Sequence, residues 1–267
     1  PPADARDNPA RGRRRGAGRE PDYPVHPPGG SGRMPAGEEM HMPIDLRAEQ
    51  QSTLERPRLR YSAAARVFFA MMDLVTGRRT TLAKVLLIET LASIPYRAWE
   101  LRQYERMTSR YREPSAVARA RAIAAWGRHA QDNEYRHLLV IDERMREEKL
   151  GRPWYLRRPV PALMVFGYRV LARLMALVDI RRAFLFNAEF EDHAEHVYAA
   201  FVADHPEMER QPVESALVSR YTDVETWADV FRRIGLDERD HMNDSFTLAG
   251  MPGRAIRYEG MPPPPPL

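Results

Sequence analysis

The sequence predicts an all-α fold in which long helices form a four-helix bundle around buried carboxylates. Three observations lead to this prediction. Apolar residues recur about every 3.6 residues through the middle of the chain, and no long segment alternates between apolar and polar residues as a half-buried strand does. Two segments, Glu134–His137 and Glu238–His241, each place a glutamate three residues before a histidine. Two further glutamates, Glu89 and Glu191, fall on the apolar faces of other predicted helices.

Both ends of the chain differ in composition from its middle. The first fifty residues hold nine of the 23 prolines and seven of the 15 glycines, and five prolines precede the final Leu267. Such segments bury too little apolar surface to offset the entropy of ordering. We therefore expect disordered tails over residues 1–51 and 249–267, on either side of one domain over residues 52–248.

Composition excludes several kinds of site. The chain contains no cysteine, which rules out disulfides, thiolate metal sites and iron–sulfur clusters. A metal would have to bind nitrogen and oxygen atoms, which suits iron or manganese. Five arginines lie between Arg11 and Arg19, but no aromatic residues are interleaved with them, so we expect a solvated segment and no nucleic-acid partner.

Proline, glycine and the helical period divide the middle of the chain into helices. Pro57 marks the start of the first helix and Gly77 its end, and Pro114 starts the third. The His205–Pro206 pair ends the fifth. We expect long helices at about 57–76, 79–110, 114–148, 154–178, 180–204 and 223–247, and a short helix near 213–220.

The helix expected over residues 154–178 is apolar on most of its surface. Its arginines, Arg158, Arg169 and Arg173, fall on one stripe. The longest uncharged run, residues 159–168, is far shorter than the ~20 residues that span a bilayer, so we expect no transmembrane helix. An apolar helix with an arginine stripe is typical of a helix lying in the membrane interface. The alternative is a core helix with solvated arginines.

The four glutamates carry the functional argument. A buried carboxylate is costly unless it is paired or binds a metal, and four of them on four long helices need a shared cation. In the two Glu-x-x-His segments, the spacing puts both side chains on one face of a helix. Two such helices plus two single glutamates form the ligand set of a di-iron site in a helical bundle.

Glutamate and histidine also fall three residues apart by chance. Glu38 and His41 form such a pair in the tail, with no periodic helix around them. Chance does not explain two pairs on core faces with matching single glutamates. We therefore expect a dinuclear site with six ligands: Glu89, Glu134, His137, Glu191, Glu238 and His241.

Sequence boxes around these ligands resemble those of the alternative oxidases, the cyanide-insensitive ubiquinol oxidases. The segment Leu87–Pro95 resembles that family's Leu-Glu-Thr-Val-Ala-x-Val-Pro motif, and Asn133–Leu138 resembles Asn-Glu-Arg-Met-His-Leu. Phe190–Tyr198 and Asp237–His241 are similar to two further boxes, and Asp73–Gly77 is similar to the end of the family's first helix. The boxes follow the family's order and cover about residues 60–246.

The resemblance implies a ferritin-like four-helix bundle with a di-iron carboxylate core and two membrane-interfacial helices. It implies that the six ligands bind two iron ions, that Tyr198 is a redox-active tyrosine and that Asn133 supports the site; Tyr221 is matched only loosely. The implied quinol pocket contains Lys84, Glu89 and Val197. Two of these depart from the family, since Lys84 replaces an arginine and Val197 replaces a hydroxyl residue.

The activity that the resemblance implies is ubiquinol oxidation coupled to reduction of dioxygen to water, without proton pumping. Tyr198 would give an electron and a proton during O–O cleavage. The implied location is monotopic, on the matrix face of the mitochondrial inner membrane or the cytoplasmic face of a bacterial inner membrane. Ubiquinol, dioxygen and the lipid surface are the expected partners, and a homodimer or a respiratory assembly stays open. Three alternatives remain: a di-iron quinone-linked oxygenase or hydroxylase, a metal-storage protein, and a non-catalytic di-iron subunit of a respiratory assembly.

Overall fold

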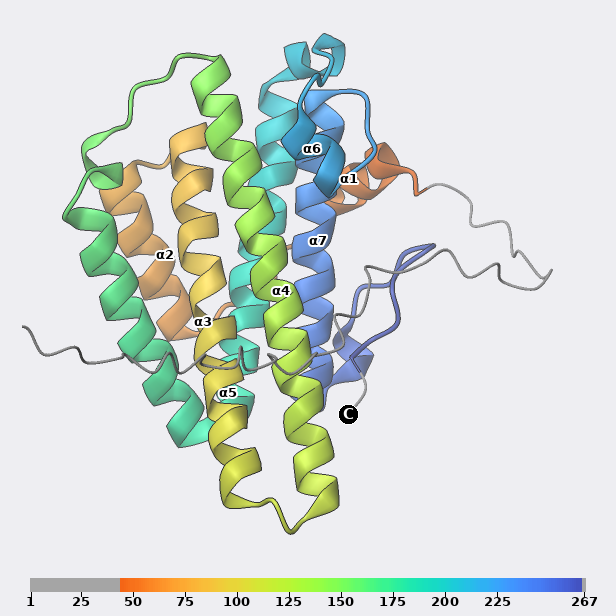
Figure 1. Ribbon diagram of the computed structural model, residues 1–267. Coiled ribbons are helices and arrows are strands. Elements are labelled where there is room, and N and C mark those ends of the chain that lie inside the picture. The colour runs from red at the N-terminus through yellow and green to blue at the C-terminus, as the bar shows by residue number, and fades with distance from the viewer. Residues whose placement is uncertain (1–43, 266–267) are drawn as a thin grey trace, which may run out of the picture. The chain divides into compact units, whose positions relative to one another are not determined.

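The computed structural model describes residues 44–265, which form seven α-helices and three short 3-10 helices and contain no β-sheet (Figure 1). The all-α prediction is confirmed. The helices are α1 (Leu46–Glu55), α2 (Ala63–Thr76), α3 (Leu82–Ser109), α4 (Pro114–Glu147), α5 (Val160–Asp204), α6 (Ala216–Tyr221) and α7 (Trp227–Leu248). The short turns are η1 (Trp154–Leu156), η2 (Pro206–Arg210) and η3 (Pro252–Arg254). The arginine cluster at Arg11–Arg19 and the Glu38–His41 pair lie outside the described residues.

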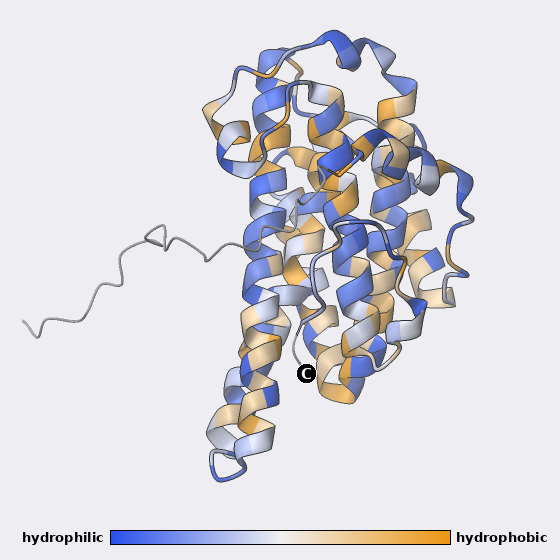
Figure 2. Cartoon of the chain, turned by 90° about the vertical axis from the view of Figure 1, so that its right-hand side faces the viewer, coloured by the Kyte–Doolittle hydropathy of each residue, from blue (hydrophilic) through white to orange (hydrophobic). Residues whose placement is uncertain are grey.

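Four long helices build the bundle core. α3 packs along α4, while α5 packs along both α7 and α3. Figures 1 and 2 show that the far end of the α3–α4 hairpin extends beyond the other helices. Capping residues fix two of the helix starts, because Thr81 accepts a hydrogen bond from the Lys84 backbone N–H and Thr226 accepts one from that of Asp229.

The first two helices differ from the single helix expected over residues 57–76. Pro57 does not start a helix; the chain runs non-helically from there to Ser62, which caps α2. The expectation of a disordered tail up to residue 51 is corrected, because residues 46–55 form α1. Asp45 caps this helix, and Thr53 is buried against the bundle.

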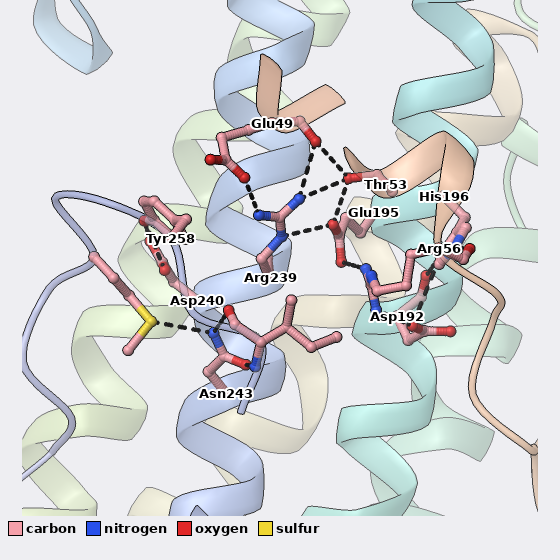
Figure 3. A network of polar contacts seen from close by, with 12 residues as sticks. Glu49, Thr53, Arg56, Asp192, Glu195, His196, Arg239, Asp240, Asn243 and Tyr258 are labelled. Carbon is pink, nitrogen blue, oxygen red and sulfur yellow. Dashed lines mark hydrogen bonds and ion pairs between the residues drawn. The ribbon is translucent and has the colours of Figure 1, made fainter. Parts of the chain in front are cut away.

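Polar contacts hold α1 in place (Figure 3). The Arg239 guanidinium on α7 donates to Glu195 Oε1 at 2.8 Å, to Thr53 Oγ1 at 2.8 Å and to the Glu49 carbonyl at 3.0 Å. Arg56, directly after α1, forms ion pairs with Glu195 and with Asp192. The helix is therefore fixed by buried charge pairs more than by apolar packing.

The C-terminal segment also differs from the expected disordered tail, as far as residue 265. The Asn243 side chain brackets the backbone of Ile256, with an N–H···O distance of 2.8 Å on one side and 2.9 Å on the other. The Tyr258 hydroxyl contacts the Asp240 carboxylate at 2.8 Å (Figure 3). These contacts hold the segment against α7.

The two helices expected at 154–178 and 180–204 form one long element. α5 runs to Asp204 and contains a break at Asp179, whose φ of −157° and ψ of 101° are extended rather than helical. The expected boundary is thus a kink. Residues 154–156 form η1 instead of the first turn of the helix.

α2 and the first half of α5 expose large apolar side chains. Leu74 is 86% exposed and Val178 is 84% exposed. The others are Val67, Met71, Leu163, Phe166, Val170, Leu171, Leu174 and Leu177. We call these residues the apolar face. The side of the molecule toward the viewer in Figure 2 contains many hydrophilic residues along its helices. Within residues 44–265, no helix is both long enough and apolar enough to cross a bilayer.

Candidate metal centre

The structure brings all six predicted ligands together in the bundle core. The six residues come from four helices: Glu89 from α3, Glu134 and His137 from α4, Glu191 from α5, and Glu238 and His241 from α7. All six side chains are buried, and the four glutamates have no exposed surface. The helical period therefore places each glutamate on the face toward the bundle axis, as its apolar neighbours require.

The ligand atoms form two overlapping groups. In each group, one atom from every residue lies within 4.8 Å of the others. One group is Glu89, Glu134, His137 and Glu238, and the other is Glu134, Glu191, Glu238 and His241. Glu134 and Glu238 belong to both groups, so their carboxylates lie between two positions that could each hold a metal ion. This arrangement is consistent with a di-metal site.

The hydrogen bonding of the cluster tests whether these residues fit a metal. Both carboxylate oxygens of Glu134 and of Glu238, and Oε2 of Glu191, are buried without a hydrogen-bond partner among the described residues. His241 Nδ1 lies 2.8 Å from Glu134 Oε1 but is not aligned as a hydrogen bond. Buried polar atoms are nearly always satisfied, so five free oxygens converging on one spot fit bound cations.

The pKa values of the cluster also indicate that its negative charge needs to be balanced by protons or cations. Burial, followed by the charges of Glu238 and Glu134, raises the pKa of Glu89 well above its usual range. The pKa of Glu191 is raised for the same reasons. Burial acts to raise the pKa of Glu238 as well, but the His137 and His241 rings beside it outweigh burial and lower this pKa to about 2. The cluster can therefore hold its charges only by sharing protons or by binding cations.

Two tyrosines donate to the single glutamates in a crossed pattern. Tyr198, seven residues after Glu191, donates to Glu89 on the neighbouring helix. Tyr96, seven residues after Glu89, donates to Glu191 Oε1 at 2.6 Å. Asn187 donates to the same oxygen at 3.0 Å. Tyr96 and Asn187 are not among the predicted site residues, although Tyr96 follows Glu89 by the same seven residues that separate Tyr198 from Glu191.

A carboxylate outside the cluster orients one of its histidines. His137 Nε2 lies 3.1 Å from Asp237 Oδ2, which also accepts a hydrogen bond from the Tyr221 hydroxyl at 2.6 Å. Burial raises the pKa of Asp237, but the Arg233 guanidinium and the His137 bond hold it well below the usual range. An ionised carboxylate on the outer nitrogen of a ligating histidine is a common feature of metal sites.

Other predicted site residues lie outside the cluster. Lys84 is buried, and its ammonium donates to Asp73 Oδ1 at 2.5 Å and to the Gly77 carbonyl at 2.9 Å. Val197 is buried among apolar side chains. Asn133 is half-buried and has no recorded hydrogen bond to a ligand. Of the expected quinol-pocket residues, only Glu89 belongs to the cluster.

A solvent pocket between α4 and α7 reaches the Glu/His cluster. It has a volume of about 630 Å³, and the C-terminal segment forms one of its walls. The predicted ligand His241 lines it, together with Trp126, Asn133 and Asp244. Small polar molecules can therefore approach the centre from this side.

Comparison with known proteins adds no family to this description: no family model matches the chain, and no curated protein matches it. The resemblance to the alternative oxidases rests on the sequence boxes and on the cluster that they form.

Proposed function

We propose that the chain is a di-iron oxidoreductase that reduces dioxygen to water with electrons from a quinol. One observation carries this proposal: four carboxylates and two imidazoles from four helices converge in a buried cluster whose free oxygens need cations. Iron fits the donor set, which contains only oxygen and nitrogen atoms. When bound, two ferrous ions would supply the redox chemistry that dioxygen reduction needs.

The chain's own residues would hold, orient and shield this centre. Each of the two overlapping groups would hold one ion, with Glu134 and Glu238 shared between them. Asp237 fixes the ring of His137, and Tyr96 and Asn187 fix the carboxylate of Glu191. Buried phenylalanine and leucine side chains of α3, α5 and α7 form an apolar core that would shield the centre on the sides away from the pocket.

Tyr198 would supply a proton and an electron close to the centre. Its hydroxyl donates to Glu89 and has no exposed surface. Burial, followed by the charge of Glu89, raises the phenol's pKa well above its usual range, so the hydroxyl keeps its proton. A neutral phenol that is hydrogen-bonded to a ligand carboxylate can lose its proton and an electron together.

The apolar face supports delivery of a lipid-soluble quinol from a membrane surface. We propose that the chain binds monotopically to an inner membrane through α2 and the first half of α5. Their exposed large apolar side chains can enter the lipid, and Arg158 and Arg169 are exposed beside them. Arg173 instead forms an ion pair with Glu105 at 3.0 Å.

The solvent pocket favours a second function. A pocket of about 630 Å³ that reaches His241 can admit a polar substrate, as a di-iron hydroxylase or oxygenase would require. Two of the three N–H groups of the Lys84 ammonium already donate to Asp73 and to the Gly77 carbonyl, which leaves one for a quinol. Product analysis separates the two functions, because an oxidase yields quinone and water while an oxygenase adds oxygen to its substrate.

Iron content together with oxygen uptake tests the proposal. The wild-type protein should bind two irons and consume dioxygen with ubiquinol in the presence of cyanide. Glu134→Ala and Glu238→Ala should each lose iron and activity, because each removes a shared ligand. Glu100→Ala is the matched control, since Glu100 is a buried glutamate on α3 that pairs with Arg97 and Arg128 outside the cluster. Full iron content in both ligand variants would refute the assignment.

A further inference from the structure

Tyr96 differs from Tyr198 in its aromatic surroundings. The ring of Tyr96 lies 5.5 Å from that of Trp99 and 5.2 Å from that of Trp126, between centroids. Among the described residues, the recorded aromatic neighbour of Tyr198 is Phe231, whose ring is much harder to oxidise. Tyrosine and tryptophan side chains can lose an electron reversibly, and tunnelling between them is fast when their rings are in contact. Of the two tyrosines at the centre, Tyr96 is therefore the one with redox-active neighbours.

Trp126 extends this contact to the solvent pocket. Trp126 is 7% exposed and lines the pocket, and its indole N–H donates to Asp244 Oδ2 at 2.8 Å. Trp99 stacks on Trp126 with centroids 5.8 Å apart but does not line the pocket. A path of oxidisable rings thus runs from Glu191 at the cluster through Tyr96 to Trp126 at the pocket.

We propose that Tyr96 and Trp126 form an electron path between the metal centre and the solvent pocket, and that the pocket takes a water-borne one-electron reductant. The inference rests on the proposed di-iron function, which supplies the oxidant when dioxygen is reduced. It adds a second entry for electrons, apart from the membrane-borne quinol.

The transfer balances along the hydrogen bonds that the structure records. The Tyr96 O–H bond breaks; its electron goes to the oxidised centre and its proton to Glu191 Oε1. Trp126 then gives one electron to the tyrosyl radical, which takes the proton back from Glu191. The reductant in the pocket gives one electron to oxidised Trp126, beside the carboxylate of Asp244. The net result is one electron moved from the reductant to the centre, with both side chains restored.

Electron paramagnetic resonance tests the path without relying on turnover. The full chain, loaded with ferrous iron, is mixed with dioxygen in the absence of quinol and then frozen. Tyr198→Phe should keep a tyrosyl signal, and the double variant Tyr96→Phe/Tyr198→Phe should lose it. With ascorbate as the probe, Trp126→Phe should slow the decay of the Tyr96 signal at least tenfold. Trp99→Phe is the matched control and should leave the decay unchanged.

The possible outcomes separate this inference from the function on which it rests. Wild-type protein that fails to bind two irons overturns the metal centre and the path with it. Two bound irons with no tyrosyl signal in Tyr198→Phe, or with equal ascorbate decay in Trp126→Phe and Trp99→Phe, overturn the path alone. If Trp126→Phe does not fold, mass spectrometry of wild-type protein after oxidation without reductant decides. Added oxygen should then accumulate on Trp126 rather than on Trp99, and the reverse result refutes the path.

Discussion

In the cluster, protons and metal ions compete for the same atoms. Without a cation, Glu89 and Glu191 keep their protons, because burial and the neighbouring charges of Glu238 and Glu134 raise their pKa. Burial acts to lower the pKa of His137 and His241, but neighbouring groups, led by Tyr221 at His137 and by Glu134 at His241, more than reverse this and raise both pKa values. A metal ion must displace these protons, since it binds carboxylates and neutral imidazoles.

We therefore expect metal binding to release protons and to weaken as the pH falls. The four raised pKa values mean that metal-free protein carries protons on the ligands at neutral pH, and lowering the pH adds to that competition. Each displaced proton should weaken apparent affinity about tenfold per pH unit. Calorimetry with manganous ion in two buffers of different ionisation enthalpy measures the release. Binding without proton release would show that the ligands are already ionised.

Lys84 is predicted to belong to the quinol pocket, but its contacts indicate a structural role. Its ammonium joins the start of α3 to the end of α2 through Asp73 and the Gly77 carbonyl. Lys84→Met should therefore lower the free energy of unfolding by about 1–2 kcal/mol, since Asp73 is partly exposed and can be solvated. Chemical denaturation measures this loss. A changed KM for ubiquinol at unchanged stability would restore Lys84 to the quinol pocket.

At the scale of elements, α1 is bound to the helices that carry the metal ligands. Arg239 directly follows Glu238 on α7, and Glu195 lies one turn after Glu191 on α5. The Arg239–Glu195 ion pair and its contacts with α1 thus restrain two ligand-bearing helices (Figure 3). Gly235, one turn before Arg239, lets α7 pack closely against α5, because a Cβ at this position would lie 3.2 Å from the Cβ of Tyr198.

Arg239→Ala should destabilise the protein by about 3 kcal/mol, because it leaves the buried Glu195 with one cation fewer. Arg47→Ala is the matched control: Arg47 also joins α1 to the rest of the chain, through Glu209, but its side chain is exposed and its loss should cost little. Thermal and chemical unfolding measure both variants. Equal losses in the two variants would mean that the buried network adds no more than a surface ion pair.

These elements show how far the sequence could predict the structure. The cluster of six side chains was predictable because a spacing of three residues and an apolar period are local patterns. The anchoring of α1 was not, because Arg239 and Glu49 are 190 residues apart and their pairing leaves no local pattern. The crossed tyrosines fall between these cases: the spacing is visible, but the identity of the accepting glutamate depends on how α3 packs against α5.

At the scale of the whole molecule, two surfaces of different chemistry lie outside the candidate metal centre. One is the apolar face of α2 and the first half of α5, and the other is the solvent pocket between α4 and α7. Soluble proteins rarely leave so many large apolar side chains exposed together unless a partner or a membrane covers them. We propose that lipid covers the first surface and that a water-borne reductant binds at the second.

Binding to lipid vesicles tests the apolar face. Leu74→Asp combined with Val178→Asp should reduce binding to vesicles of phosphatidylcholine and phosphatidylglycerol, because these are the most exposed apolar side chains of the face. Each would place a charge where lipid tails are expected, while the free energy of unfolding should hardly change, since neither side chain is packed. Arg158→Glu with Arg169→Glu should weaken binding as well, since a basic residue near an anionic surface contributes about 1 kcal/mol.

Tyr135→Asp is the control, because Tyr135 is exposed on α4, outside the apolar face. Co-sedimentation measures all three proteins, and equal losses for Tyr135→Asp and the apolar pair would show that added negative charge, not the apolar face, governs binding.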